Sequence, residues 1–157
     1  MNAAEKVTME WLMAKGYFVM SGVKQGRREA DFLAIKLGSS GQVEEKAHVE
    51  VQVSSNPAGD LVPAGYVEGK FGGVEDTARK FLGNSYSKWV VLGMARGGRE
   101  GLEAYGKEFE EVGVRTISFR QVIEEYLGTL TTRPLAEMGD LLHILRSFGF
   151  VRAQQEN

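Results

Sequence analysis

Three polar residues stand where short runs of apolar residues predict strands. Asp31 lies at the start of the run 30–37, and Glu50 and Gln52 alternate with valines in the run 47–53. Because side chains alternate along a strand, Glu50 and Gln52 share one face. If these two strands pair, the carboxylates of Asp31 and Glu50 lie close together on one side of the sheet.

Two neighbouring carboxylates in an apolar environment repel each other and are costly to desolvate. A hard divalent cation removes that cost. Mg²⁺ prefers oxygen ligands, usually one or two carboxylates together with waters and phosphate oxygens. The pattern therefore predicts a magnesium site, although an ordinary half-exposed strand with one polar face explains the same alternation without any metal.

The surrounding sequence predicts an α/β domain with a mixed five-stranded sheet flanked by helices. The first three strands have short connections and should form an antiparallel meander, while the later strand-helix-strand unit implies parallel pairing. Irregular segments are expected at 21–28 and 54–73. Helices are expected at 3–15, 74–82, 102–111, 121–127 and from 134 to about 149, and strands at 17–20, 30–37, 47–53, 88–94 and 114–119.

Length and composition fit one globular domain spanning residues 1–157, with a core at about 3–128. The absence of cysteine excludes disulfides, zinc-cysteine sites, iron–sulfur clusters and cysteine nucleophiles, and two histidines exclude a histidine-rich metal site. No apolar run is long enough for a membrane helix and no secretory signal pattern is visible. We therefore expect a cytoplasmic protein without a membrane partner.

The net charge of −2 is not that of a strongly basic nucleic-acid-binding protein, but the charges are segregated along the chain. Residues 70–99 hold six basic and two acidic side chains, and residues 100–125 hold seven acidic and three basic ones. Either one face of the molecule is locally basic, or two solvated helices carry opposite charge.

Four motifs, in order, resemble the PD-(D/E)xK nuclease superfamily, and most of all its Holliday-junction-resolvase group. They are a first helix carrying Glu5, the strand Gly16–Val19, the segment Gly26–Ala34 and the strand Val49–Gln52. The resemblance covers residues 1 to about 55 by motif and extends to about 125 by element order. It implies a restriction-endonuclease-like core.

The resemblance also implies roles for particular residues. Asp31 and Glu50 would ligate Mg²⁺ or Mn²⁺, and the carbonyl of Val51 would add a ligand. Glu5 matches a glutamate that faces the metal site in such proteins, although an acidic residue at the start of a helix also stabilises the helix without any further function.

Gln52 is the main departure, because it stands where the family has lysine. Glutamine offers a donor and an acceptor but no charge, so it could hold a metal-bound water while the metal supplies more of the catalysis. The resulting prediction is a metal-dependent endonuclease that hydrolyses DNA, with branched or structured DNA as the preferred substrate. The alternatives are a catalytically inactive module that binds nucleic acid or a protein partner, and an RNA-processing enzyme.

Several basic residues are candidates for contacts with backbone phosphates, with a solvated surface as the alternative. They are Lys24, Arg27 and Arg28 before the second predicted strand, and Arg79 and Lys80 on the helix 74–82.

The remaining polar residues point to chemistry less directly. His48 shares the Glu50 face, and we expect it to be an ordinary residue at the end of a strand rather than part of the rim of a site. His143 is expected to have no chemical role. Residues 54–56 either contact substrate or begin a loop. Gly97-Gly98 lacks the context of a phosphate-binding loop, so no nucleotide cofactor is expected.

The last predicted helix carries an apolar stripe. Packing of this stripe on the core and formation of a homodimer through it explain the pattern equally well. The stripe consists of Leu141, Leu142, Leu145 and Phe148.

Overall fold

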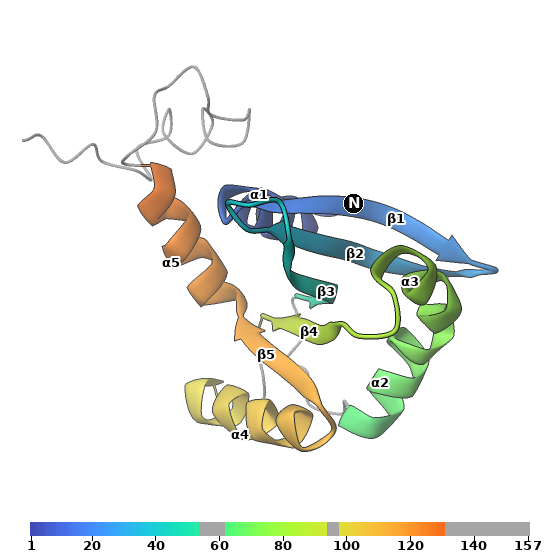
Figure 1. Cartoon of the computed structure of the whole chain (residues 1–157). Coiled ribbons are helices and arrows are strands. Elements are labelled where there is room, and N and C mark those ends of the chain that lie inside the picture. Colours follow the sequence, from blue (N-terminus) through green and yellow to red (C-terminus); the bar gives the residue numbers. More distant parts are fainter. Residues whose placement is uncertain (54–61, 94–97, 131–157) are drawn as a thin grey trace, which may run out of the picture.

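The computed structural model describes residues 1–53, 62–93 and 98–130, which form an α/β domain (Figure 1). Its elements follow one another in the order expected for a sheet with helices on its faces. They are α1 (Ala3–Ala14), β1 (Tyr17–Gln25), β2 (Arg28–Leu37), β3 (Val43–Gln52), α2 (Pro63–Lys70), a 3₁₀ helix (Gly72–Val74), α3 (Glu75–Leu82), β4 (Ser87–Leu92), α4 (Gly98–Glu111), β5 (Val114–Ser118) and α5 (Phe119–Leu130).

The five strands form one mixed sheet in the order β1-β2-β3-β4-β5. The pairs β1–β2 and β2–β3 are antiparallel, whereas β3–β4 and β4–β5 are parallel. The predicted meander followed by parallel strands is therefore confirmed.

Helices cover both faces of the sheet (Figure 1). Trp11 of α1 and Tyr126 of α5 pack with Val49 and Val51 on one face. Residues of α2, α3 and α4 pack on the other. This explains the continuous apolar centre of β4, whose residues 89–92 are all at most 2% exposed.

The first hairpin is longer than the sequence predicts. The expected irregular segment 21–28 is wrong, because β1 continues to Gln25 and pairs directly with Arg28. Only Gly26 and Arg27 form the turn, and the φ of 62° at Gly26 is of the kind that a type II′ hairpin turn requires at its first central position. Backbone pairing with β2 keeps this polar segment extended although its side chains have little strand preference.

The expected irregular segment 54–73 is also wrong where the structure describes it. Residues 63–70 form α2, and a 3₁₀ helix begins at Gly72. Glycines at 65 and 69 lower the intrinsic helix propensity. Burial of Tyr66 (9% exposed) and Phe71 (0%) in the core opposes that cost, so tertiary packing explains the helix.

Other boundaries differ by less. β3 begins at Val43 rather than Ala47, and α4 begins at Gly98 rather than Leu102. The predicted last helix with its apolar stripe, His143, and residues 54–56 lie outside the described residues. Within the described ranges, no helix combines the length and apolar character needed to cross a membrane.

We predict that Phe71→Ala lowers the free energy of unfolding by about 3–5 kcal/mol, because it leaves a cavity in a fully buried position. Urea denaturation measures this loss. The matched control is Phe81→Ala, which removes a side chain that is 50% exposed and should cost less than about 1 kcal/mol. Equal losses for the two variants would show that Phe71 does not anchor α2.

Candidate functional site

The structure brings Asp31 and Glu50 together where the backbone pairing of β2 with β3 stops. The last paired residues are Phe32 and Val49. Beyond them, side chains continue the contact: the Val51 N–H donates to Asp31 Oδ2 over 2.8 Å, and the Asp31 N–H lies 3.4 Å from Glu50 Oε1. We call Asp31 and Glu50 the carboxylate pair.

The half-exposed strand, which was the alternative explanation of the alternation, is wrong. Val49 and Glu50, on opposite faces of β3, are each 0% exposed. Asp31 is partly buried. Leaving an ionised carboxylate in such a place costs several kcal/mol unless other groups compensate it. Glu50 must therefore have partners that stabilise its charge.

Two cationic or donor side chains provide that compensation. His48 Nε2 lies 2.8 Å from Glu50 Oε1, and Lys70 Nζ lies 3.3 Å from Glu50 Oε2. Toward a carboxylate in its ionised form, which only accepts hydrogen bonds, His48 Nε2 is the donor. Oε2 has no hydrogen-bond partner within the part of the chain that the structure describes, although it is buried.

His48 is more deeply placed than the sequence suggests. It lies inside β3 rather than at a strand end, it is 0% exposed, and its ring meets Phe71 edge-on with centroids 4.7 Å apart. The expectation of an ordinary strand-end residue is therefore wrong. His48 contacts Glu50 along the same face of β3, and Phe71 packs against the imidazole.

The pKa of the Asp31 carboxyl is raised by its surroundings. Burial, followed by the negative charge of Glu50, raises the Asp31 pKa to about 6. The hydrogen bond from Val51 and the charge of Lys70 act in the opposite direction, and the charge of Glu5 adds a smaller repulsion. Unusual acidity in a cluster of this kind is typical of functional sites.

Helix α2 supplies the part of the site that sequence reasoning missed. Lys70 is its last residue, and Tyr66 lies one turn earlier with a buried hydroxyl that has no hydrogen-bond partner among the described residues. Burial and the charges of Glu50 and Asp31 raise the pKa of Tyr66. The sequence offers no reason to single out Tyr66 and Lys70, because the segment that forms α2 is expected to be irregular.

Glu5 has a structural role in the first turn of α1. Its carboxylate accepts hydrogen bonds from the backbone N–H and the side-chain amide of Asn2, at 2.9 and 2.6 Å, and completes a capping box. Glu5 also lies near enough to Asp31 for its charge to act on that carboxyl. The helix-stabilising role of Glu5 is therefore confirmed, whereas its place beside a metal site stays a prediction.

Gln52 is the last residue of β3 and is partly buried. By alternation it shares the face of Glu50, and its backbone carbonyl accepts a hydrogen bond of 3.1 Å from Gly93. The neighbouring Val51 points into the opposite core, so only its backbone takes part in the site. The side-chain amide of Gln52 brings no charge to the carboxylate pair.

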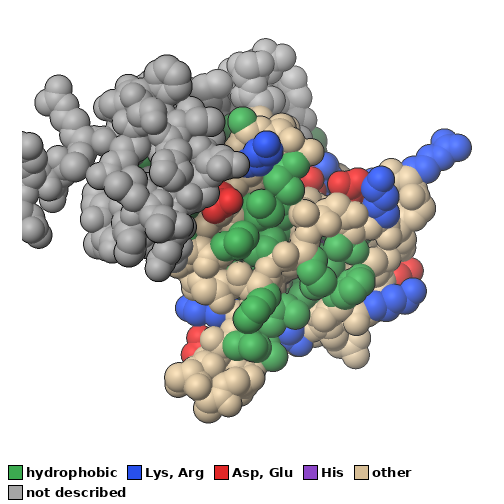
Figure 2. Space-filling view, turned by 90° about the horizontal axis from the view of Figure 1, so that it is seen from above, with side chains coloured by type: hydrophobic (Ala, Val, Ile, Leu, Met, Phe, Trp, Pro, Cys, Tyr) green, Lys and Arg blue, Asp and Glu red, His purple; other side chains and the backbone are tan. Residues whose placement is uncertain are grey.

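The predicted phosphate-binding residues are exposed, and the ion pairs of Lys24 and Arg79 are with acidic neighbours rather than with the carboxylate pair. Lys24 pairs with Glu29 at 3.5 Å, Arg79 pairs with Glu75 at 2.8 Å, and Arg27 and Lys80 are exposed. On the face of the molecule seen in Figure 2, Lys and Arg side chains stand apart from one another around a band of hydrophobic ones.

Arg28 is the exception, because it contacts the helix that carries Lys70. Its guanidinium donates a hydrogen bond to the Gly69 carbonyl, and its side chain runs against Gly73. Together with Glu68 and glycines of this segment it lines an open hollow of about 450 Å³.

Among the residues that the structure describes, no cluster of three or more histidine, aspartate or glutamate side chains could hold a metal ion. An all-protein metal cage therefore does not fit. A hydrated Mg²⁺ or Mn²⁺ does fit, because it needs only one or two carboxylates and takes its other ligands from water and substrate. Glu50 Oε2 is buried and has no hydrogen bond, and the Lys70 ammonium 3.3 Å from it shows that a positive charge is accommodated beside this oxygen.

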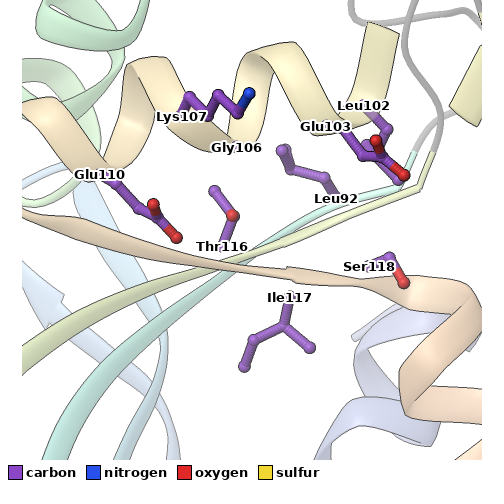
Figure 3. A pocket seen from close by; sticks show the side chains of 9 residues that line it. All are labelled: Leu92, Leu102, Glu103, Gly106, Lys107, Glu110, Thr116, Ile117 and Ser118. Carbon is purple, nitrogen blue, oxygen red and sulfur yellow. The ribbon is translucent and has the colours of Figure 1, made fainter. Parts of the chain in front are cut away.

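A second hollow, of about 360 Å³, lies between α4 and β5. Figure 3 shows Glu103 and Glu110 of α4 on one wall and Thr116 of β5 opposite them, while Ile117 points to the other side of the strand. Neither residue of the carboxylate pair lines it, so this hollow is separate from the candidate site.

Comparison of the chain with protein-family models, curated proteins and solved structures gives no match.

We predict that Asp31→Asn stabilises the protein above pH 7. The Asp31 pKa rises from 3.8 to about 6 on folding, so the stability contributed by the protonated form is fully present below the lower value and is lost as pH rises through the higher one. The amide oxygen can still accept the Val51 N–H. With allowance for partial solvent screening, the gain at pH 8 should be about 1 kcal/mol and should vanish near pH 4.

Urea denaturation at the two pH values measures this difference. Glu108→Gln, at an exposed position on α4, is the control and should change stability little at either pH. A loss of stability in Asp31→Asn at pH 8 would contradict the electrostatic account.

Proposed function

We propose that this protein is a metal-dependent endonuclease that hydrolyses DNA phosphodiester bonds. The observation that carries the proposal is the convergence of Asp31 and Glu50 at the end of the β2–β3 pairing, where the buried Glu50 carboxylate also meets the Lys70 ammonium. These are the two residues to which the family resemblance assigns the metal.

The proposal includes a restriction-endonuclease-like core. Its support is the element order, in which a helix and three antiparallel strands are followed by helices and two parallel strands. The motifs that carry the resemblance lie on α1, β1, β2 and β3, and thus on neighbouring parts of this arrangement. A cytoplasmic location belongs to the same proposal.

Asp31 and Glu50 would hold Mg²⁺ or Mn²⁺, with the carbonyl of Val51 as a further ligand. When bound, such an ion lowers the pKa of a coordinated water and stabilises negative charge on the phosphate. In the hydrolysis, the water oxygen bonds to phosphorus, one ester P–O bond breaks, and a proton of the water ends on the leaving oxygen.

The chain's own residues prepare this reaction. His48 keeps the Glu50 carboxylate in one orientation through the 2.8 Å contact, and the Val51 N–H does the same for Asp31. Gln52 on the same face could orient the attacking water as both donor and acceptor. Fixing these groups before substrate arrives reduces the reorganisation that the reaction requires.

The second candidate is a catalytically inactive module of the same fold that binds nucleic acid or a protein. The uncharged Gln52 and the absence of a third acidic metal ligand in the described ranges favour it. Calorimetry with MnCl₂ separates the two, because an inactive module that has lost the metal site should give no binding at millimolar Mn²⁺.

We predict that the wild-type chain with Mg²⁺ or Mn²⁺ cleaves at least one of a set of linear, flapped and four-way DNAs. Asp31→Asn and Glu50→Gln should each reduce the rate by about 10²–10³, the loss typical when a group that stabilises the transition state is removed. Gel assays with labelled DNA measure the rate, and the same structures made of RNA test whether the substrate is RNA.

The matched control is Glu111→Gln, which alters an exposed carboxylate at the end of α4 and should leave the rate unchanged. Wild-type protein that cuts none of these substrates, or cleavage that persists in Asp31→Asn, would refute the proposed nuclease activity.

A further inference from the structure

The candidate site contains more negative charge than its strand residues can balance. Asp31 and Glu50 are adjacent, Glu5 adds its charge from α1, and Gln52 is neutral. A phosphodiester is itself an anion. Its approach to two carboxylates therefore requires positive charge from the protein in addition to any bound metal.

Lys70 brings such a charge from a different element. Its Nζ lies 3.3 Å from Glu50 Oε2, and its side chain is 43% exposed while that of Glu50 is 0% exposed. The ammonium therefore lies at the boundary between the buried carboxylate and solvent. With three N–H donors, it can face Glu50 and still offer donors to a second anion.

The position of Lys70 is fixed by its neighbours. Phe71, the next residue, is fully buried and packs edge-on against His48, which in turn contacts Glu50. Tyr66, one turn earlier, packs edge-on against Phe71 with centroids 6.4 Å apart. The end of α2 is thus docked on the residues that surround Glu50.

A lysine at the end of a helix has an ordinary explanation, because cations there interact favourably with the helix dipole. That explanation requires only that the side chain lie near the last turn. It does not account for the contact with a fully buried carboxylate in another element, nor for the burial of Tyr66 and Phe71 on the same segment.

Resting on the proposed function, we propose that Lys70 supplies from α2 the positive charge that Gln52 lacks on β3, and that its ammonium binds a phosphate oxygen of the substrate beside Glu50. Lys70 would then stabilise the charge that grows on the phosphate oxygens as the water oxygen bonds to phosphorus. The chemistry of the site would thus combine two carboxylates from the sheet with one cation from a helix.

The first test moves the charge between the two elements. Lys70→Met should lower kcat for DNA cleavage by about 10²–10³, and the double variant Lys70→Met/Gln52→Lys should recover most of that loss. Lys70→Arg keeps the charge and should retain most of the activity. Lys107→Met, which removes an exposed lysine of α4, is the control and should cleave as the wild type does.

The second test needs no activity. Lys70→Met should bind Mn²⁺ about tenfold more tightly than the wild type in calorimetry with MnCl₂, because a positive charge beside Glu50 has been removed. Lys107→Met should bind Mn²⁺ as the wild type does. Circular dichroism and the thermal unfolding midpoint establish that each variant is folded.

Different results separate the two proposals. A wild type that cleaves DNA, together with a Lys70→Met variant that cleaves equally well or binds Mn²⁺ with unchanged affinity, overturns the role of Lys70 alone. A wild type that neither cleaves DNA nor binds Mn²⁺ overturns the proposed function and this inference with it. If Lys70→Met does not fold, cleavage by Lys70→Gln at the wild-type rate overturns the inference.

Discussion

The site depends on one hydrogen bond, from the Val51 N–H to the Asp31 carboxylate at 2.8 Å. At this point the backbones of β2 and β3 have stopped pairing, and a side chain takes the place of a backbone carbonyl. The bond therefore both extends the sheet contact and holds Asp31 beside Glu50. It offsets part of the repulsion between two carboxylates that the adjoining Phe32–Val49 pairing keeps close together.

The other contacts around Glu50 can be understood as compensation for that repulsion. A donor from His48 and a cation from Lys70 meet different oxygens of the same carboxylate. The compensation is incomplete, because Oε2 has no hydrogen bond and the Asp31 pKa remains raised. Structural ion pairs are normally balanced more fully, so the arrangement favours a site that is completed by a ligand.

The sequence predicts the sheet and the carboxylate pair well because both depend on local patterns. Alternation in β3 assigns Glu50 to a face, and short connections require β2 and β3 to be neighbours. The sequence does not reveal α2, since Gly65 and Gly69 weaken its helical signal and its stability comes from distant packing of Phe71. Lys70 and the burial of His48 depend on that helix, so neither could be found from local sequence.

The contact between Arg28 and Gly69 gives β2 a second influence on the site. Asp31 belongs to the same strand, three residues further on. The segment from Arg28 to Asp31 therefore places the Asp31 carboxylate directly and also supports Lys70, through the contact of Arg28 with α2. A slip of β2 by a single residue would turn Asp31 to the opposite face and separate Arg28 from Gly69 in the same movement. Because β2 positions both Asp31 and the helix that carries Lys70, a shift of this strand would displace the negative and the positive charge of the site at the same time.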